Sequence, residues 1–339
     1  MKPYPLVFKP ILKPKVWGGH RLAQLGKSLP AEAAIGESWE LADLPQAIPD
    51  GRSVITNGPL AGRTLHEVIG EHEQQIMGAA ALTDENGFPL LIKFLDAREN
   101  LSVQVHPSED YVRQHPQAHL KSEAWVVVAA EPGAVIYRGV KPDVTAEQFA
   151  AHIETGDVVD DLIAVPVKTG ECWYLPSGTC HALGAGIVVA EIQTPSDTTF
   201  RVFDWGRTGR ELHVSQALGC IHFGAPAEEP EPPGLPVQAA GMKTTPLLKT
   251  GHFAIERLEA FTDAVLPVVT SGLPVVWMIL NGRAQVAASH GSSDSIEVDL
   301  PIGTTALMPA ALEDTVARLA PETSLLRITL PSPMEGLIA

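Results

Sequence analysis

Residues 170–181 read GECWYLPSGTCH: a glycine, five residues, a proline–glycine turn and a histidine. The apolar run 172–175 inside this stretch is typical of a short buried strand. Proline and glycine break strands, so a tight turn is expected directly after it. That turn presents His181 at the start of the next strand. The stretch therefore predicts a strand–turn–strand unit that carries a histidine.

The same spacing occurs a second time, where residues 303–309 read GTTALMP. His181 lies five residues after the first proline, Pro176, and Asp314 lies five residues after the second, Pro309. An internal repeat of this kind is a signature of duplicated units. We therefore expect two related β-barrels, the first with a working site and the second without.

The composition favours many short strands joined by turns, because the 339 residues include 29 Gly and 29 Pro. Apolar segments rich in β-branched residues predict strands at 90–95, 124–128, 187–192 and 275–280. Thr145 and Gln148 form a capping box that predicts a helix through Ile153, and residues 64–78 predict another. The expected class is mainly β, with a few helices inserted in or packed on the N-terminal part.

Residues 224–236 are rich in proline and acid, which is typical of an extended linker. The length leaves room for two domains. We expect a catalytic metal-binding domain over 1–225, a linker over 226–238 and a second, metal-free barrel over 239–339.

The charge balance disfavours several classes of partner. The chain has 24 Lys plus Arg and 40 Asp plus Glu, a formal net charge of −16. An acidic surface repels nucleic acid and anionic membrane, although one local cluster of cations suffices for a small phosphorylated substrate. No apolar run reaches about 18 residues, and the N-terminus lacks the apolar core of a signal peptide. The three cysteines fit neither a disulfide framework nor a zinc finger, so a reduced, cytoplasmic protein is expected.

Two polar patterns interrupt the apolar strands. Ser102, Gln104 and His106 alternate with valines and so share one face of a strand. Lys121 and Glu123 share a face by the same rule, just before the apolar run 124–128. Singly, each has a plain structural explanation: a solvated face, an exposed ion pair or a buried histidine.

Together these side chains indicate a metal site. His106, Glu123 and His181 offer two imidazoles and one carboxylate, and Gln104 adds an amide oxygen. Two histidines and one carboxylate with an open position are typical of catalytic zinc. The same donors also suit manganese, iron or cobalt.

The pattern resembles a known family. Gly170 to His181 matches the second cupin motif, with Ala185 at the position of its usual final asparagine. The first cupin motif, His-x-His followed by Glu, is altered to Gln104-x-His106 followed by Glu123. This alteration resembles the short bacterial form of type I mannose-6-phosphate isomerase. The resemblance extends over the ordered segments 17–19, 35–40, 89–93, 102–107, 121–123, 178–183, 191–193 and 196–205.

The resemblance implies two cupin-type (jelly-roll) barrels and reversible isomerisation of mannose 6-phosphate and fructose 6-phosphate through a cis-enediol. It implies a small-molecule sugar phosphate as partner and a monomer or homodimer. In this family Gln, His, Glu and His bind zinc, which maps onto Gln104, His106, Glu123 and His181.

The remaining site residues are also implied by the resemblance. Lys121 and Asp197 are candidates for the proton-transferring base, although Asp197 also fits a plain turn residue. Arg201 joins this catalytic set and is the best candidate to hold the phosphate, because arginine binds phosphate through two parallel hydrogen bonds. The family's pattern adds three phosphate-binding residues: Ser102, Lys93 and Arg207.

Two other readings remain open. A non-catalytic sugar- or metal-binding cupin is disfavoured by Lys121 and Arg201, which such a barrel does not need. Another cupin enzyme, a dioxygenase or an isomerase of a different sugar phosphate, is disfavoured by Gln104, where such enzymes usually carry histidine. A regulator would need a DNA-binding unit, which neither the charge nor any helix-turn-helix pattern supplies.

Overall fold

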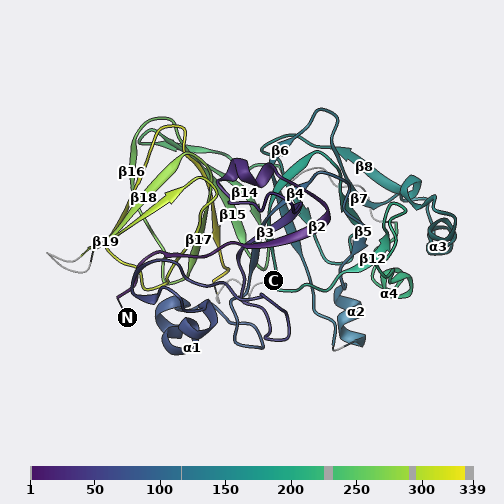
Figure 1. Cartoon of the computed structure of the whole chain (residues 1–339), viewed down its shortest axis with the longest axis horizontal. Helices are drawn as coiled ribbons and strands as arrows, with labels where there is room; N and C mark the ends of the chain where they lie inside the picture. Colours follow the sequence, from purple (N-terminus) through teal and green to yellow (C-terminus); the bar gives the residue numbers. More distant parts are fainter. Residues whose placement is uncertain (1, 116, 225–231, 290–294, 333–339) are drawn as a thin grey trace.

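The computed structural model describes residues 2–115, 117–224, 232–289 and 295–332. Within these residues the chain forms four antiparallel sheets and four short α-helices, which confirms the mainly β class. Figure 1 shows two lobes side by side, one built on strands β14–β19 (green to yellow) and the other on β5–β12 (teal). Strands β2, β3 and β4 lie between them. The division into two barrels stays a prediction.

Two sheets make up the part that carries the candidate site. The six-stranded sheet has the order β2 (Ile11–Gly19), β3 (Ile35–Leu41), β4 (Leu91–Ala97), β11 (Ile187–Gln193), β6 (Glu123–Ala130) and β9 (Cys172–Leu175). The five-stranded sheet has the order β12 (Phe200–Phe203), β5 (Val103–Val105), β10 (His181–Leu183), β7 (Val135–Val140) and β8 (Leu162–Pro166). The strands expected at 90–95, 124–128 and 187–192 are thus confirmed as β4, β6 and β11.

The other two sheets lie mostly in the C-terminal part. The seven-stranded sheet has the order β1 (Leu6–Val7), β20 (Thr305–Met308), β17 (Val275–Asn281), β22 (Ser324–Thr329), β15 (Ala254–Ala260), β14 (Met242–Lys249) and β13 (Val237–Ala239). The four-stranded sheet has the order β16 (Ala264–Pro267), β21 (Thr315–Leu319), β18 (Arg283–Ser289) and β19 (Ser295–Pro301). The strand expected at 275–280 is confirmed as β17.

All the described α-helices lie before residue 219: α1 (Leu65–Ile76), α2 (Glu109–Gln114), α3 (Ala146–Thr155) and α4 (Val214–Leu218). Single-turn 3-10 segments occur at Arg21–Leu25, Gly58–Leu60 and Val158–Asp161. Helices α1 and α3 confirm the two expected from sequence, and each begins with a complete capping box. None of the described helices is long and apolar enough to cross a membrane.

The repeated glycine-to-proline spacing gives the same local structure twice. Gly170 and Gly303 both adopt positive φ angles, 95° and 76°, that favour glycine. A four-residue strand begins two residues later in each copy, β9 in the first and β20 in the second. The next strand in each copy, β10 or β21, begins at His181 or directly after Asp314.

The N-terminal residues also contribute to the C-terminal lobe. Strand β1 pairs with β20, with Leu6 opposite Leu307. The end of α1 is bound there too, because the backbone N–H of Ala310 donates to the carbonyl of Ile76 at 2.9 Å. The first six residues of the linker expected at 226–238 lie outside the described residues, and its last two residues begin β13. The predicted domain boundaries stay a prediction.

A buried ion pair ties the two parts together. The Lys27 ammonium lies 2.6 Å from Glu40 Oε2 and donates to the Gly303 carbonyl, also at 2.6 Å. Both charged side chains are at most 5% exposed. The Ser38 hydroxyl donates to the other Glu40 oxygen at 2.5 Å. Because every group in this cluster has a partner, removing one leaves an uncompensated buried charge.

We predict that Lys27→Met lowers the free energy of unfolding by about 3–5 kcal/mol, the usual cost of breaking a buried pair from one side. Urea denaturation followed by circular dichroism measures this. The control is Lys243→Met, whose half-exposed pair with Glu259 is expected to contribute at most about 1 kcal/mol. Equal effects of the two substitutions would contradict the structural role of Lys27.

Candidate active site

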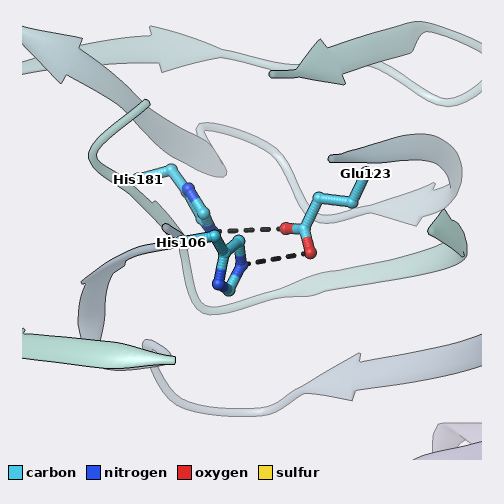
Figure 2. A group of neighbouring side chains, drawn as sticks. All are labelled: His106, Glu123 and His181. Carbon is cyan, nitrogen blue, oxygen red and sulfur yellow. Dashed lines mark ion pairs between the residues drawn. The ribbon is translucent and has the colours of Figure 1, made fainter. Parts of the chain in front are cut away.

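Three side chains converge from strand ends that lie far apart in sequence. His106 directly follows β5, His181 begins β10 and Glu123 begins β6. Strands β5 and β10 pair with Gln104 opposite His181, so the two histidines reach the site from one sheet. Glu123 reaches it from the six-stranded sheet. Figure 2 shows its carboxylate facing the two imidazoles.

The two imidazoles face the two oxygens of one carboxylate. His181 Nε2 lies 3.2 Å from Glu123 Oε1, and His106 Nε2 lies 3.3 Å from Glu123 Oε2. The dashed lines in Figure 2 mark these two contacts. All three side chains are almost fully buried, and their ligand atoms lie within 4.8 Å of one another. This spacing suits a single cation held by all three.

Backbone carbonyls orient both imidazoles. His106 Nδ1 lies 3.0 Å from the carbonyl oxygen of Thr198, and His181 Nδ1 lies 2.8 Å from that of Thr179. A carbonyl only accepts, so each Nδ1 carries a proton and donates it. Each Nε2 therefore directs a lone pair at the Glu123 carboxylate. Metal-ligating histidines are usually held in this way.

The carboxylate lacks hydrogen bonds where it is buried. Neither Glu123 oxygen accepts a well-aligned hydrogen bond from a described residue. The Lys121 ammonium lies 2.8 Å from Oε2, close enough to supply charge without that alignment. Two imidazole lone pairs directed at a buried anion are unfavourable unless further positive charge lies among them. The donor set therefore fits a divalent metal.

Burial and charge set the protonation states of these groups. Burial alone would raise the pKa of Glu123, but Lys121 and His106 hold that pKa well below its usual range. Burial, with repulsion from Lys121, lowers the pKa of His106 to about 3. An ionised carboxylate and a neutral imidazole are the forms that bind a metal.

A cavity of about 270 Å³ lies beside these groups and reaches Gln104 and Lys121. Aromatic and aliphatic side chains form part of its wall: Trp17, Trp39, Leu95, Leu101 and Trp125. Its polar lining consists of Lys15, Glu37, Lys93, Ser102, Gln104, Lys121, Glu191, Asp197, Thr199, Arg201 and Arg210. This mixture of apolar wall and a few polar groups is typical of a small-molecule site.

The cations of the cavity wall differ in how they are paired. Lys15 lies 2.9 Å from Glu37, and Lys93 lies 2.9 Å from Glu191. Burial alone would lower the pKa of Lys93, but Glu191 and Glu37 raise it. Among the described residues, Arg201 and Arg210 form no ion pair with a carboxylate that lines the cavity. They are the cations best placed to bind an anion.

Sequence and structure comparisons identify the relatives of this chain. Residues 6–132 match the model for the phosphomannose isomerase type I catalytic domain. Mannose-6-phosphate isomerase ManA of Bacillus subtilis is 36% identical over 275 residues, covering 77% of this chain and 81% of that protein. The chain belongs to the type I mannose-6-phosphate isomerase family.

Two further relatives agree with this assignment. The mannose-6-phosphate isomerase of Streptococcus mutans serotype c is 37% identical over 261 residues, covering 75% of this chain and 78% of that protein. The crystal structure of the mannose 6-phosphate isomerase from Bacillus subtilis aligns with a TM-score of 0.82 and 26% identity, over 96% of this chain and 99% of that chain. The family expected from the altered cupin motif is confirmed.

The structure brings most of the expected site residues of this family member together. Strands β12, β5 and β10 place Arg201, Gln104 and His181 at register-matched positions in one row. The Gln104 amide nitrogen lies 3.3 Å from His181 Nε2. Other expected residues line the cavity: Ser102, Lys93, Lys121 and Asp197. Arg207 does not line it.

Several cavity residues were not assigned from sequence. Glu37 and Glu191 lie in segments that carry the family resemblance, but no charge pattern distinguishes them from packing residues. Arg210 follows Asp204 and Arg207 in a glycine-containing loop. The only signal there is the spacing of two arginines after one aspartate, which is too short to indicate a site by itself.

We predict that chelator-treated protein binds one equivalent of a divalent metal such as Zn²⁺, measured by titration calorimetry. His181→Ala removes one of the buried donors, so affinity falls by more than the roughly 10–100-fold typical of losing an outer-shell partner. His152→Ala is the matched control, because His152 pairs with Asp161 away from the site. Unchanged affinity in His181→Ala would show that the three donors do not bind the metal.

Proposed function

We propose that this chain is a zinc-dependent aldose–ketose isomerase that interconverts mannose 6-phosphate and fructose 6-phosphate. The observation that carries the proposal is the buried Glu123 carboxylate facing two imidazole lone pairs beside a cavity lined by cations. Five Lys or Arg side chains line that cavity against three Asp or Glu. Family membership supports the same reaction. The substrate is accordingly a small anionic sugar.

The reaction moves a proton between C1 and C2, and it requires a polarising group, a base and an anion site. His106, Glu123 and His181 would hold the metal, with Gln104 as the fourth donor. When bound, zinc stabilises negative charge that develops on the substrate oxygens. The amide is the weakest of the four donors, because its oxygen already accepts from the Ser102 hydroxyl at 3.5 Å and its nitrogen is the atom that lies 3.3 Å from His181 Nε2.

Two groups of the cavity wall are proposed for the proton transfer. Lys121 is buried and lies against His106 and Glu123, at 3.0 Å and 2.8 Å respectively. Asp197 is exposed and lies in the loop before β12. Both reach the cavity, so geometry allows either group to contact a bound sugar.

Arg201 is proposed to bind the phosphate together with Ser102. One terminal nitrogen of Arg201, Nη1, donates to the carbonyl of Glu211 at 2.7 Å, while its Nε is buried without a hydrogen-bond partner. An arginine with unused donors in a cavity suits an anion. Lys93 also lines the cavity, but it already donates to Glu191 at 2.9 Å and Gln193 at 2.7 Å. One donor of Lys93 is left for substrate.

A coupled assay that follows fructose 6-phosphate formed from mannose 6-phosphate tests the proposed reaction. We predict turnover by the metal-loaded protein, loss of turnover after thorough chelation, and recovery when Zn²⁺ is restored, because substrate polarisation depends on the metal. Treating the protein with chelator already saturated with Zn²⁺ is the control. Activity that survives complete metal removal would refute the metal role.

Substitution of the two candidate bases identifies the proton-transfer group. Removing a general base lowers kcat by about 10²–10⁴-fold. We predict this loss in Lys121→Ala or in Asp197→Asn, with KM nearly unchanged, when each variant is compared with the parent at full metal loading. Metal content is measured by atomic absorption on the same samples. Full activity in both variants would exclude both residues as essential bases.

A further inference from the structure

Arg210 is a second guanidinium on the wall of the cavity that Arg201 lines. Building on the proposed function, we propose that Arg210 binds the phosphate group of the sugar phosphate together with Arg201. We further propose that Asp204 is the positioning residue that holds Arg210 in place. Neither the sequence patterns nor the comparisons assign a role to these two residues.

The backbone after β12 brings Arg210 next to Arg201. Gly206 and Gly209 adopt positive φ angles of 76° and 86°, which allow the chain to turn back on itself. The returning segment is fixed to β12, because the N–H of His213 donates to the carbonyl of Arg201 at 2.7 Å. The Arg201 side chain is bound to the same segment through the carbonyl of Glu211.

Asp204 holds the Arg210 side chain by two parallel bonds. Arg210 Nε donates to Asp204 Oδ2 at 2.7 Å, and Arg210 Nη2 donates to Oδ1. The Asp204 side chain is only 3% exposed. A fork–fork pair of this kind fixes the plane of the guanidinium. Arg210 Nη1 makes no hydrogen bond within the described residues, so it is available to an anion while Asp204 stays bound.

Arg207 uses the same carboxylate but is differently placed. Arg207 Nε lies 3.2 Å from Asp204 Oδ1, and Nη2 donates to the carbonyl of Asn100 at 2.7 Å. Its Nη1 lies 3.7 Å from Glu99. Because Arg207 makes these contacts outside the cavity lining, it is less well placed than Arg210 to bind the substrate. The proposal therefore places the second phosphate-binding arginine at 210, whereas the family pattern predicts it at 207.

The charge of this cluster complements a phosphate. Arg207 and Arg210 both pair with the buried Asp204, and Arg201 lies close enough to these three groups to feel their charges. Within the described residues, the only other carboxylate paired with these guanidiniums is Glu99, which is 54% exposed. The buried Arg201 Nε without a partner is an independent sign of a missing acceptor. A phosphate group has the charge and the several acceptor oxygens that such a site requires.

The test uses the metal-loaded protein and two readouts, KM for mannose 6-phosphate and the inhibition constant of inorganic phosphate. Arg210→Lys keeps the charge but loses the fork, so both constants are expected to rise about 10-fold with kcat within about threefold of the parent. Arg207→Lys is the matched comparison and is expected to raise both constants less. Arg283→Lys is the control, because Arg283 forms an exposed pair with Asp299 in the C-terminal part. It is expected to leave both constants unchanged. A larger effect at 207 than at 210 would overturn the assignment.

The Asp204→Asn variant distinguishes two roles of Asp204: holding the Arg210 side chain in place, or acting only through its negative charge. The substitution removes a negative charge near the anion site, so a purely electrostatic role predicts tighter binding of inorganic phosphate. A positioning role predicts weaker binding, because Arg210 loses its fork. We expect weaker binding, with recovery in Asp204→Glu. Tighter binding in Asp204→Asn would overturn the positioning role, and the Arg210 variants decide the binding role even where Asp204→Asn does not fold.

Binding of inorganic phosphate by calorimetry keeps this inference separate from the proposed function. If the parent isomerises mannose 6-phosphate and Arg210→Lys has the same KM and the same inhibition constant for phosphate, the role of Arg210 is contradicted and the proposed reaction is not. If the parent lacks isomerase activity but binds inorganic phosphate more tightly than Arg210→Lys does, the proposed reaction is contradicted and the role of Arg210 is not.

Discussion

The arrangement of the site follows from one constraint: the Glu123 carboxylate is buried and ionised, and it needs positive charge beside it. Two imidazoles turn lone pairs toward it because backbone carbonyls hold their other nitrogens. Lys121 supplies one positive charge, and a metal bound by the three donors would supply more. Burying an ion is affordable only when the surrounding groups match it. The paired strands around the site keep these groups in register.

Much of this was predictable from local sequence. The glycine-to-proline spacing predicted β9 and the start of β10 because strand and turn residues act over a few positions. The capping box at Thr145 predicted the start of α3, and the structure shows a second capping box at Thr64, where α1 begins. Helices α2 and α4 were not expected, since six and five residues are too short for a helical period to show. Spacing cannot reveal which distant strands pair, so the row of Arg201, Gln104 and His181 required the structure.

The same limit applies to charged residues of the cavity wall. Lys93 interrupts an apolar strand, and sequence alone left open whether it reaches solvent or finds a partner. Register decides the matter, because Lys93 of β4 lies opposite Glu191 of β11. Arg207 and Arg210 are alike in sequence and share one carboxylate, and only the path of the loop directs one of them to the cavity. Long-range geometry, not residue type, separates their roles.

The pairing of β1 with β20 has a consequence for how the chain is made. Leu6 leaves the ribosome about 300 residues before Leu307, its partner across the sheet. During synthesis the N-terminal strand therefore has no native neighbour on that side, and the last carbonyls of α1 lack the N–H donors of Ala310 and Ala311. Contacts of such sequence separation slow folding. A nascent chain in this state exposes an unpaired edge, so chaperone capture or delayed collapse of the N-terminal half is expected to accompany its biogenesis.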